Sequence, residues 1–266
     1  MQEEIDELIL KGVEKDIICQ RFSDEGWVTK PVYVPAEMHI TIFVNSQELV
    51  TIMCTPIKLN CLVIGFLYAE GIISDLSDVM SMRVCEEETT ADVRLSNSEY
   101  QLPILKKTLT SGCGGGSAFK NQAEKVDSDM VIKPDDALFL MKELLEHMDL
   151  YRLCGGVHAS ALADRRDLLI VAEDIGRHNT FYKIQGECLL RGISTKDRLL
   201  LSTGRVSSEM LLKAAGMHIP IVISRTSPTG RGISLARGLG ITLVGYARGK
   251  RLSVYSHPER LGCSTN

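Results

Sequence analysis

The sequence lacks paired cysteines, and its N-terminus lacks the features of a secretion signal. Its eight cysteines are scattered and contain no C-x-x-C pair. The first residues, Met1 to Asp6, are acidic rather than basic, which is not typical of a signal peptide. A disulfide framework is therefore not indicated, and we expect reduced thiols and a cytoplasmic location.

Long apolar runs and a strong excess of either charge are also missing. The longest apolar stretch, Cys61 to Ala69, is far too short to cross a bilayer, so no membrane association is expected. The 30 Lys and Arg against 34 Asp and Glu give a net charge of −4, which argues against non-specific nucleic-acid binding. A hydrophobic content of 44% over 266 residues is ordinary for a globular protein of one large or two modest domains.

Familiar phosphate and zinc motifs are absent as well. A glycine-rich run exists, but it has no Walker A lysine and does not lead from a strand into a helix in G-x-G-x-x-G register. Cys154 and His158 have a plausible spacing for zinc ligands. The Pro-Cys-x-x-Cys half of the zinc deaminase signature is nevertheless missing, so we expect no tightly bound zinc.

The first half of the chain has the pattern of a β-rich unit. Residues 27–54 alternate in the manner of strands, with a turn at Asn45 and Ser46, and shorter strands are expected near 79–85 and 91–95. Thr55 and Pro56 predict a helix start, with Thr as N-cap and Pro at the first helical position. Helical spacing then continues until Gly71.

The second half alternates between helical and strand patterns, which predicts an α/β domain with a mixed or mostly parallel sheet. The expected helices cover 135–148, 178–191, 207–216 and 229–238. The expected strands cover 157–163, 167–172, 198–202, 219–224, 241–246 and 252–255. We place the division between a β-rich domain, 1–119, and an α/β domain, 120–266.

One thiol, Cys113, lies in the run from Thr110 to Ser117, among four glycines and three small hydroxyl residues. Such a segment forms a mobile loop or a backbone with positive φ, and either leaves the sulfur accessible. Reactive cysteines need that exposure, whereas structural ones prefer apolar surroundings. We therefore expect a functional thiol, the alternative being an incidental cysteine in a linker.

Polar clusters follow the expected strands of the second half. Two of them carry Gly-Arg turns, at Arg177 with His178 and at Arg205, where a strand leads into a helix. Helix N-termini and arginines favour phosphate groups, so these turns indicate a phosphate-bearing ligand. The alternative is that they are plain helix caps and surface ion pairs.

A further basic turn lies between two expected strands near the C-terminus. It consists of Tyr246, Ala247, Arg248, Gly249, Lys250 and Arg251. The functional interpretation is an anion clamp whose tyrosine offers a face to a flat base, and the alternative is a solvated hairpin. A thiol hydrolase, with Cys113 activated by His158 or His178, is a separate possibility.

Several of these runs together resemble the formate dehydrogenase accessory sulfurtransferase family (FdhD). The most specific is Glu-Asp-Ile-Gly-Arg-His-Asn at 173–179, followed by Lys183. The others are Gly155 to Ala159, Gly204 to Glu209 with Lys213 and Ala214, Thr55 and Pro56 with Gly65 to Ile73, and Ser111 to Gly114. The resemblance covers residues 30 to 260.

The resemblance implies a β-rich N-terminal part followed by a cytidine-deaminase-like α/β/α domain without deaminase activity. Members accept sulfur from a cysteine desulfurase and pass it to the molybdenum (or tungsten) bis(molybdopterin guanine dinucleotide) cofactor of formate dehydrogenase. They act as homodimers. By this resemblance Cys113 is the persulfide carrier, and the turn from Tyr246 to Arg251 holds the guanine-nucleotide end.

This sequence departs from the family pattern near the thiol. Many members have a second cysteine three positions after the first, where this chain has Gly116. Cys154 stands where threonine is usual, and it is either a second thiol or a neutral substitution. We therefore expect Cys113 to act as a single-site carrier. The rival to a sulfur carrier is a chaperone that binds the cofactor without transferring sulfur.

Overall fold

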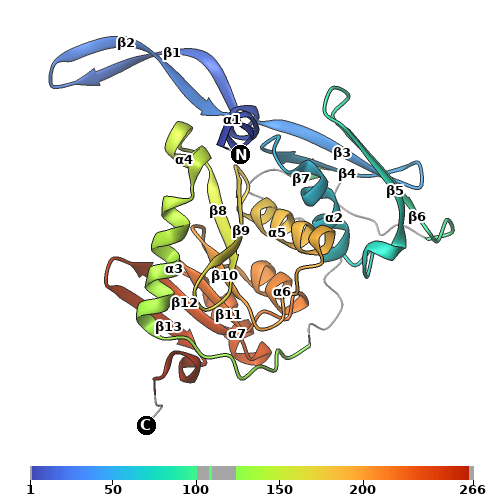
Figure 1. Ribbon diagram of the computed structural model, residues 1–266, viewed down its shortest axis with the longest axis vertical. Coiled ribbons are helices and arrows are strands. Elements are labelled where there is room, and N and C mark those ends of the chain that lie inside the picture. The colour runs from blue at the N-terminus through green and yellow to red at the C-terminus, as the bar shows by residue number, and fades with distance from the viewer. Residues whose placement is uncertain (1, 101–107, 110–123, 264–266) are drawn as a thin grey trace.

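The computed structural model describes residues 2–100, 108–109 and 124–263, whose strands form three sheets (Figure 1). Helices pack on the two larger sheets, so the expected α/β class with a β-rich first half is confirmed. Within the described residues, every helix is too short or too polar to cross a bilayer. The expected domain division at 119/120 lies outside the described residues and stays a prediction.

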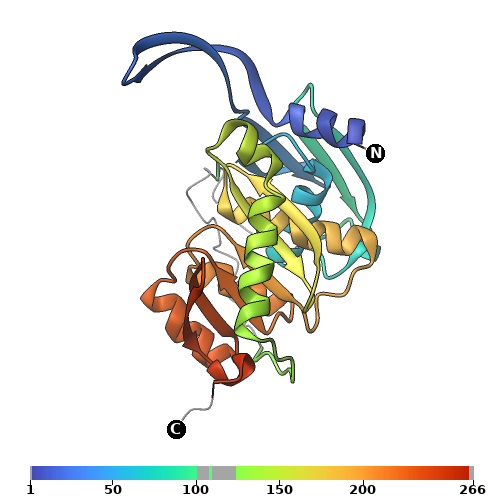
Figure 2. The same ribbon diagram turned by 60° about the vertical axis from the view of Figure 1, so that its left-hand side comes forward.

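The chain begins with a helix and a long ribbon that the sequence patterns did not predict in full. The helix α1 (Gln2–Lys11) is followed by the antiparallel strands β1 (Val13–Ser23) and β2 (Gly26–Pro35). This two-stranded ribbon extends away from the rest of the molecule in both views (Figures 1 and 2). Most of its residues are exposed, so β1 has no buried face to produce a clear pattern in the sequence.

The second sheet has the order β5-β6-β3-β4-β7 and forms the β-rich first half of the molecule. Its strands are β3 (Met38–Val44), β4 (Gln47–Cys54), β5 (Val79–Cys85), β6 (Thr90–Leu95) and β7 (Thr108–Leu109). Asn45 and Ser46 form the expected two-residue turn, with positive φ at both positions. One face packs on the apolar helix α2 (Leu59–Ala69), while a short 3-10 helix, η1 (Leu76–Asp78), precedes β5.

The predicted start of α2 was wrong by three residues. The helix begins at Leu59 after Lys58, whose φ of 52° makes it a left-handed N-cap, and not after Thr55. The polar groups of Thr55 are instead committed to the second half of the chain. Its N–H donates to Asp174 over 3.1 Å, and its hydroxyl accepts from the N–H of Ile175 over 3.1 Å. The Thr55 hydroxyl thus bonds the second half of the chain instead of the first turn of α2.

The third sheet is mixed, with the order β13-β12-β11-β10-β8-β9, as the alternating pattern predicted. Its strands are β8 (His158–Ala163), β9 (Leu168–Asp174), β10 (Leu199–Ser202), β11 (Ile221–Ser224), β12 (Thr242–Arg248) and β13 (Arg251–Ser256). Helix α3 (Pro134–Glu146) covers one face, and α5 (Arg177–Arg191), α6 (Ser208–Gly216) and α7 (Gly230–Leu239) cover the other. The result is the expected three-layer α/β/α arrangement (Figure 2). The short helix α4 (Asp149–Cys154), which was not predicted, leads into β8.

Helices α2 and α5 join the two halves of the molecule by direct backbone contact. A Cβ placed on Gly65 would lie 1.8 Å from the carbonyl oxygen of Tyr182, and one on Gly186 would lie 1.9 Å from that of Cys61. Glycine is thus required on both helices for this close crossing. Helix α5 is therefore buried on two sides, against the third sheet and against α2.

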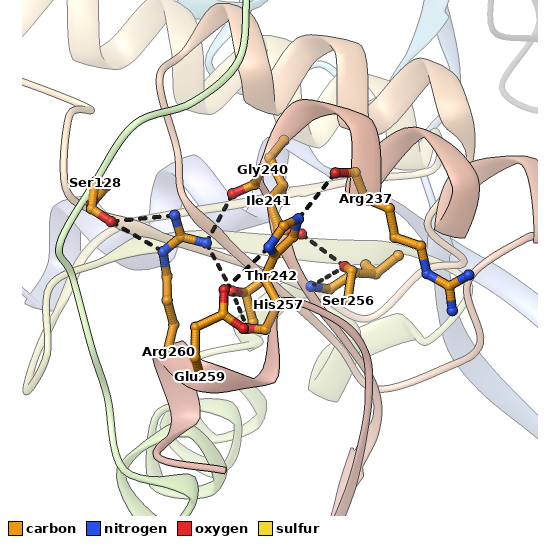
Figure 3. A network of polar contacts seen from close by, with 10 residues as sticks. Ser128, Arg237, Gly240, Ile241, Thr242, Ser256, His257, Glu259 and Arg260 are labelled. Atoms are coloured by element: carbon orange, nitrogen blue, oxygen red, sulfur yellow. Dashed lines mark hydrogen bonds and ion pairs between the residues drawn. The ribbon is translucent and has the colours of Figure 1, made fainter. Parts of the chain in front are cut away.

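The C-terminal end of the chain is fastened to the third sheet by Arg260, in the short 3-10 helix η2 (Pro258–Leu261) (Figure 3). Its guanidinium donates twice to the carbonyl oxygen of Ser128, over 3.3 and 3.2 Å, and once to that of Gly240, over 2.9 Å. It also donates to the hydroxyl of Thr242 over 3.3 Å. These bonds tie together the segment before α3, the start of β12 and the chain end.

Candidate functional site

The polar clusters identified in the sequence meet at one edge of the third sheet. Strands β10, β11 and β12 are parallel, and β8 is antiparallel to both β10 and β9. The carboxyl ends of β9, β10, β11 and β12 therefore lie at the same edge of the sheet. The start of β8 lies at that edge as well. We call this the carboxyl edge. Ligands of open α/β sheets bind at such an edge, in front of the helix N-termini.

The two predicted Gly-Arg turns contact each other at this edge. A Cβ on Gly204, after β10, would lie 3.2 Å from the Cβ of Arg177, the first residue of α5. The same point lies 3.4 Å from Nδ1 of His158, the first residue of β8. A side chain at position 204 would press on both neighbours, so glycine keeps the three chain segments close. Arg205 follows directly and is itself exposed.

Two histidines beside these arginines are held in the neutral state. Burial, followed by the charge of Arg177, lowers the pKa of His158, and Arg205 lowers it further. Burial, with the charges of Lys213 and Arg177, lowers the pKa of His178 to about 3. A buried imidazole next to cations stays unprotonated, so His178 does not add a positive charge to this edge.

His178 is also short of polar contacts within the described part of the chain. Only 4% of the residue is exposed, and neither ring nitrogen has a hydrogen-bond partner among the described residues. Its Nε2 lies 3.7 Å from a carboxylate oxygen of Glu209, in the first turn of α6. A neutral imidazole can both donate and accept one hydrogen bond, so His178 has capacity left for a ligand.

A buried lysine behind the histidine was not among our candidate site residues. Lys213 of α6 is only 5% exposed, and its ammonium lies 4.6 Å from the ring centroid of Tyr182. Burial lowers its pKa to about 8, although Glu70 and Glu209 act in the opposite direction. The sequence does contain a sign of this role, because Lys213 stands among the apolar residues of α6 that face the core.

Half of the Glu-Asp-Ile-Gly-Arg-His-Asn run is structural. Both side chains of the ion pair between Asp174 and Lys183, 2.6 Å apart, are fully buried. Asp174 also accepts hydrogen bonds from the N–H groups of Thr55 and Gly176 and from the amide of Asn179. Lys183 donates to the carbonyl oxygen of Thr55 over 3.2 Å. This clamp joins the end of β4 to the start of α5 and positions Arg177 at the carboxyl edge.

Glu173, at the start of the same run, has a separate structural role. Its carboxylate accepts from the N–H groups of Leu150 and Tyr151, both over 2.9 Å. These N–H groups belong to the first turn of α4, where a carboxylate is favoured. Burial nevertheless raises the pKa of Glu173.

The basic turn from Tyr246 to Arg251 connects β12 and β13 at the carboxyl edge. The N–H of Tyr246 donates to the carbonyl oxygen of Thr226 over 3.0 Å, and the guanidinium of Arg248 lies 5.4 Å from the tyrosine ring centroid. One face of that ring is therefore already in contact with a cation. Ala247 is fully buried, so its side chain contributes to the core beneath α3.

A cavity of about 330 Å³ lies between this turn and α3. Arg225, Arg248 and Lys142 supply its positive charges, and Leu138, Phe139 and Leu145 of α3 supply apolar surface. A volume of this size is at the lower end of the range for small-molecule sites. Its combination of apolar wall and cations suits a flat anionic group.

Comparison with known proteins shows the family of this chain. Residues 35–262 match the model of the FdhD/NarQ family. The chain belongs to the FdhD/NarQ family. It is 39% identical to the "Sulfur carrier protein FdhD" of Bacillus subtilis (strain 168), over 85% of this chain and 88% of that protein. The FdhD of Geobacillus kaustophilus (strain HTA426) is also 39% identical, over 91% of this chain and 94% of its own length.

A solved structure shares the fold of this FdhD/NarQ family member. It is described as the crystal structure of a putative formate dehydrogenase accessory protein from Desulfotalea psychrophila. The match covers 94% of this chain and 99% of the other, with a TM-score of 0.78 and 27% sequence identity. The family resemblance seen in the sequence motifs is thereby confirmed.

The thiol assigned to this FdhD/NarQ chain from its sequence, Cys113, lies outside the described residues, as does Gly116. The nearest described element is β7, whose Leu109 pairs with Ile52 of β4 in a parallel arrangement. Both strands therefore point towards Thr55, which is bonded to Asp174 at the carboxyl edge. The described end of β7, Leu109, therefore points to the side of the second sheet on which Thr55 meets the candidate site.

Four cysteines in the described part of the chain are poor nucleophiles. Burial raises the pKa of Cys54 and Cys188 to about 12 and that of Cys154 to about 11, and it also raises the pKa of Cys61. Cys154 donates to the carbonyl oxygens of Leu150 and Gly155, over 3.2 and 3.3 Å. These hydrogen bonds and the raised pKa favour the interpretation of Cys154 as a neutral substitution over that of a second reactive thiol.

Over the described ranges, His, Cys, Asp and Glu side chains nowhere gather in threes in a way that could hold a metal ion. Cys154 and His158, which have ligand spacing in the sequence, lie on α4 and β8 on either side of Gly155 and Gly156. Their surroundings differ: the thiol bonds the carbonyls of α4, whereas the imidazole faces Arg177.

Proposed function

We propose that this chain is a sulfur carrier that serves formate dehydrogenase, with Cys113 as the carrier thiol and the carboxyl edge as the cofactor site. The cargo is the molybdenum (or tungsten) bis(molybdopterin guanine dinucleotide) cofactor, and the sulfur donor is a cysteine desulfurase. The observation that carries the proposal is the contact of Arg177, Gly204 and His158 on the side towards which β7 leads. Relatives named sulfur carrier proteins support the assignment.

The carboxyl edge has the chemistry required for a polyanionic dinucleotide. Arg177 and Arg205 stand at the N-termini of α5 and α6, where N–H groups and arginine forks favour phosphate. The cavity beside Arg248 offers an apolar wall and further positive charge for a guanine-nucleotide end. The neutral His178 supplies a hydrogen bond without adding charge.

Cys113 follows Leu109 by four residues in the sequence, and an extended chain of that length spans at most about 14 Å. In the loading step, the Cys113 thiolate attacks the terminal sulfur of the donor's persulfide. A new S–S bond forms on Cys113, the donor's S–S bond breaks, and the donor leaves as a thiolate. Arg177 and Arg205 are the cations available to stabilise the thiolate and the persulfide anion.

The decisive experiment measures the mass of the protein after incubation with a cysteine desulfurase and cysteine. We expect a gain of one sulfur atom that disappears on reduction. The Cys113→Ala variant should show no gain, whereas the Cys154→Ala variant should load normally. Loading of Cys113→Ala to the wild-type level would refute the carrier role of this thiol.

A second experiment tests the cofactor site by calorimetry with GDP as a probe of the guanine-nucleotide end. The Arg205→Ala variant should bind at least about tenfold more weakly, because it loses a charge-assisted contact. Arg165→Ala is the matched control, since Arg165 is an exposed arginine in the turn between β8 and β9, at the opposite edge of the sheet. Equal affinities for all three proteins would remove Arg205 from the site.

The two rival functions predict different results in these experiments. A cofactor chaperone without sulfur transfer would bind GDP but gain no sulfur on Cys113. A thiol hydrolase would turn over an ester or amide without any sulfur donor. The cytoplasmic location, the desulfurase donor and the homodimer remain predictions from the sequence.

A further inference from the structure

A row of polar side chains lies between helices α5 and α6, which pack on the same face of the third sheet (Figure 1). His178 and Tyr182 are one turn apart on α5, and Glu209 and Lys213 are one turn apart on α6. Nε2 of His178 lies 3.7 Å from the Glu209 carboxylate. One turn further along, the ammonium of Lys213 lies 4.6 Å from the ring centroid of Tyr182. We call these four residues the polar seam.

The polar seam begins at the carboxyl edge and continues into the protein. His178 and Glu209 stand in the first turns of their helices, and Tyr182 and Lys213 lie one turn, about 6 Å, further in. The Glu209 side chain is 35% exposed, whereas Lys213 and Tyr182 are 5% and 2% exposed. A cavity of about 60 Å³ beside Tyr182, Gln185 and Lys213 has room for water at the inner end. Lys213 is therefore a buried amine one helical turn behind the candidate site.

Charged and titratable groups face Lys213 from several elements. They are Glu70 after α2, His178 and Tyr182 on α5, and Glu209 on α6 itself, with Arg177 and His158 beyond His178. The hydroxyl of Tyr182 donates to the Glu70 carboxylate over 3.1 Å, and burial raises the pKa of this tyrosine. Both carboxylates favour the charged form of Lys213, but burial outweighs them and lowers its pKa to about 8. Lys213 is thus about half protonated at pH 8.

We propose that Lys213 takes up a proton when a phosphate-bearing ligand binds at the carboxyl edge, an inference that rests on the cofactor site proposed above. Both ring nitrogens of the buried His178 are without a hydrogen-bond partner among the described residues, and a ligand that bonds them lies within about 10 Å of the amine. A unit negative charge at that distance raises the pKa of a buried amine by about one unit. The proton moves from the buffer to the Lys213 amine, and no other bond changes.

A lysine at this position has a property that an arginine lacks. An arginine stays charged at every pH near neutrality, whereas a lysine loses its proton readily when it is buried. The buried charge is costly while the carboxyl edge is empty, because no anion offsets it there. It becomes favourable when phosphate groups arrive. Lys213 is therefore a positioning residue that adjusts the charge behind His178 to the presence of the ligand.

Calorimetric titration with GDP at pH 8, in HEPES and in Tris, measures this proton uptake. The two buffers differ in their enthalpy of ionisation, so a proton taken from the buffer changes the apparent binding enthalpy. The phosphates of GDP are already ionised at this pH. We expect the wild-type chain to take up about 0.4 proton per GDP, as Lys213 goes from about half to about nine-tenths protonated.

Two substitutions of Lys213 and one control assign the proton. Lys213→Arg keeps the charge but cannot lose its proton at pH 8, so it should bind GDP without proton uptake. Lys213→Met, which places an apolar side chain of similar length in the seam, should bind without uptake as well. The control is Lys196→Met, because Lys196 is an exposed lysine that precedes β10 at the opposite edge of the sheet. It should take up protons like the wild type.

The outcomes separate this inference from the function on which it rests. Equal apparent enthalpies in the two buffers, with GDP bound by the wild-type chain, would overturn the role of Lys213 and leave the cofactor site standing. Uptake that persists in both Lys213 variants would assign the proton to another group, such as His158, and would also overturn it. A wild-type chain that does not bind GDP would refute the cofactor site and this inference together.

Discussion

Replacement of Gly186 by alanine tests the backbone contact that joins the two halves of the molecule. In the structure, the new Cβ would lie 1.9 Å from the carbonyl oxygen of Cys61 and 2.8 Å from the backbone nitrogen of Gly65. Both obstacles are backbone atoms of α2, so no change of rotamer can remove the clash. Ordinary contact needs about 3.4 Å, and α2 and α5 must therefore separate by about 1.5 Å.

The size of the expected effect follows from two opposing contributions. Overpacking of a dense core costs about 1–3 kcal/mol and occasionally more, and a backbone clash belongs at the upper end of that range. Alanine returns up to about 1 kcal/mol through its higher helix propensity. We expect Gly186→Ala to lower the free energy of unfolding by about 2 kcal/mol, which corresponds to a fall in Tm of roughly 4–8 °C in a chain of this size.

Urea unfolding followed by circular dichroism measures this change. The matched control is Gly238→Ala in α7, an exposed helical position where a new Cβ meets nothing within 4 Å. This control should be more stable than wild type by about 0.5–1 kcal/mol, because alanine is the better helix former. If Gly186→Ala were as stable as Gly238→Ala, the close crossing of the two helices would be refuted.

Three further predictions concern buried charges and thiols. Lys183→Met should lower the free energy of unfolding by about 3–5 kcal/mol, because it leaves the buried carboxylate of Asp174 without its ion pair. The control Lys142→Met breaks a surface ion pair and should lower it by less than about 1 kcal/mol in the same urea assay. Because the pKa of His178 falls from 6.5 to about 3 on folding, the unfolded chain gains a proton first as pH falls. The free energy of unfolding should fall by about 2 kcal/mol from pH 7 to pH 5 on account of His178. In urea titrations at the two pH values, the His178→Leu variant should not show this part of the fall. The third prediction concerns labelling by iodoacetamide at pH 8, measured by peptide mass. Cys54 and Cys154 should react at least about tenfold more slowly in the folded chain than in the urea-unfolded chain. Equal rates would contradict their raised pKa values.

The alternating strands and helices of the second half could be predicted because each has a simple burial pattern. Strands such as β10 and β11 are buried on both faces and appear as short, continuous apolar runs. The order of these strands follows from their alternation with helices, which also brings their carboxyl ends to one edge. The sequence pattern alone therefore predicts that the Gly-Arg turns at Arg177 and Arg205 lie at the same edge of the sheet.

Features that depend on contacts between the two halves could not be predicted. The start of α2 was misplaced because Thr55 bonds Asp174, which is 119 residues away in the chain. The lowered pKa of His178 could not be predicted either, because burial and Lys213 both act on it only in the folded protein. The strand β1 was missed for a different reason: both its faces are largely exposed, so burial imposes no periodicity on its residues.

The run at 173–179 shows why loss of activity alone cannot define the site. Asp174 and Asn179 are bonded to each other and to the end of β4, whereas Arg177 and His178, between them, face the carboxyl edge. Substitution of either kind of residue would impair a cofactor site, the first by displacing α5 and the second by removing a contact. Stability separates the two cases, since loss of the buried clamp lowers the free energy of unfolding by several kcal/mol. Arg177→Ala should lose ligand affinity with far less loss of stability than Asp174→Ala, because its role is at the surface of the edge rather than in the clamp beneath it.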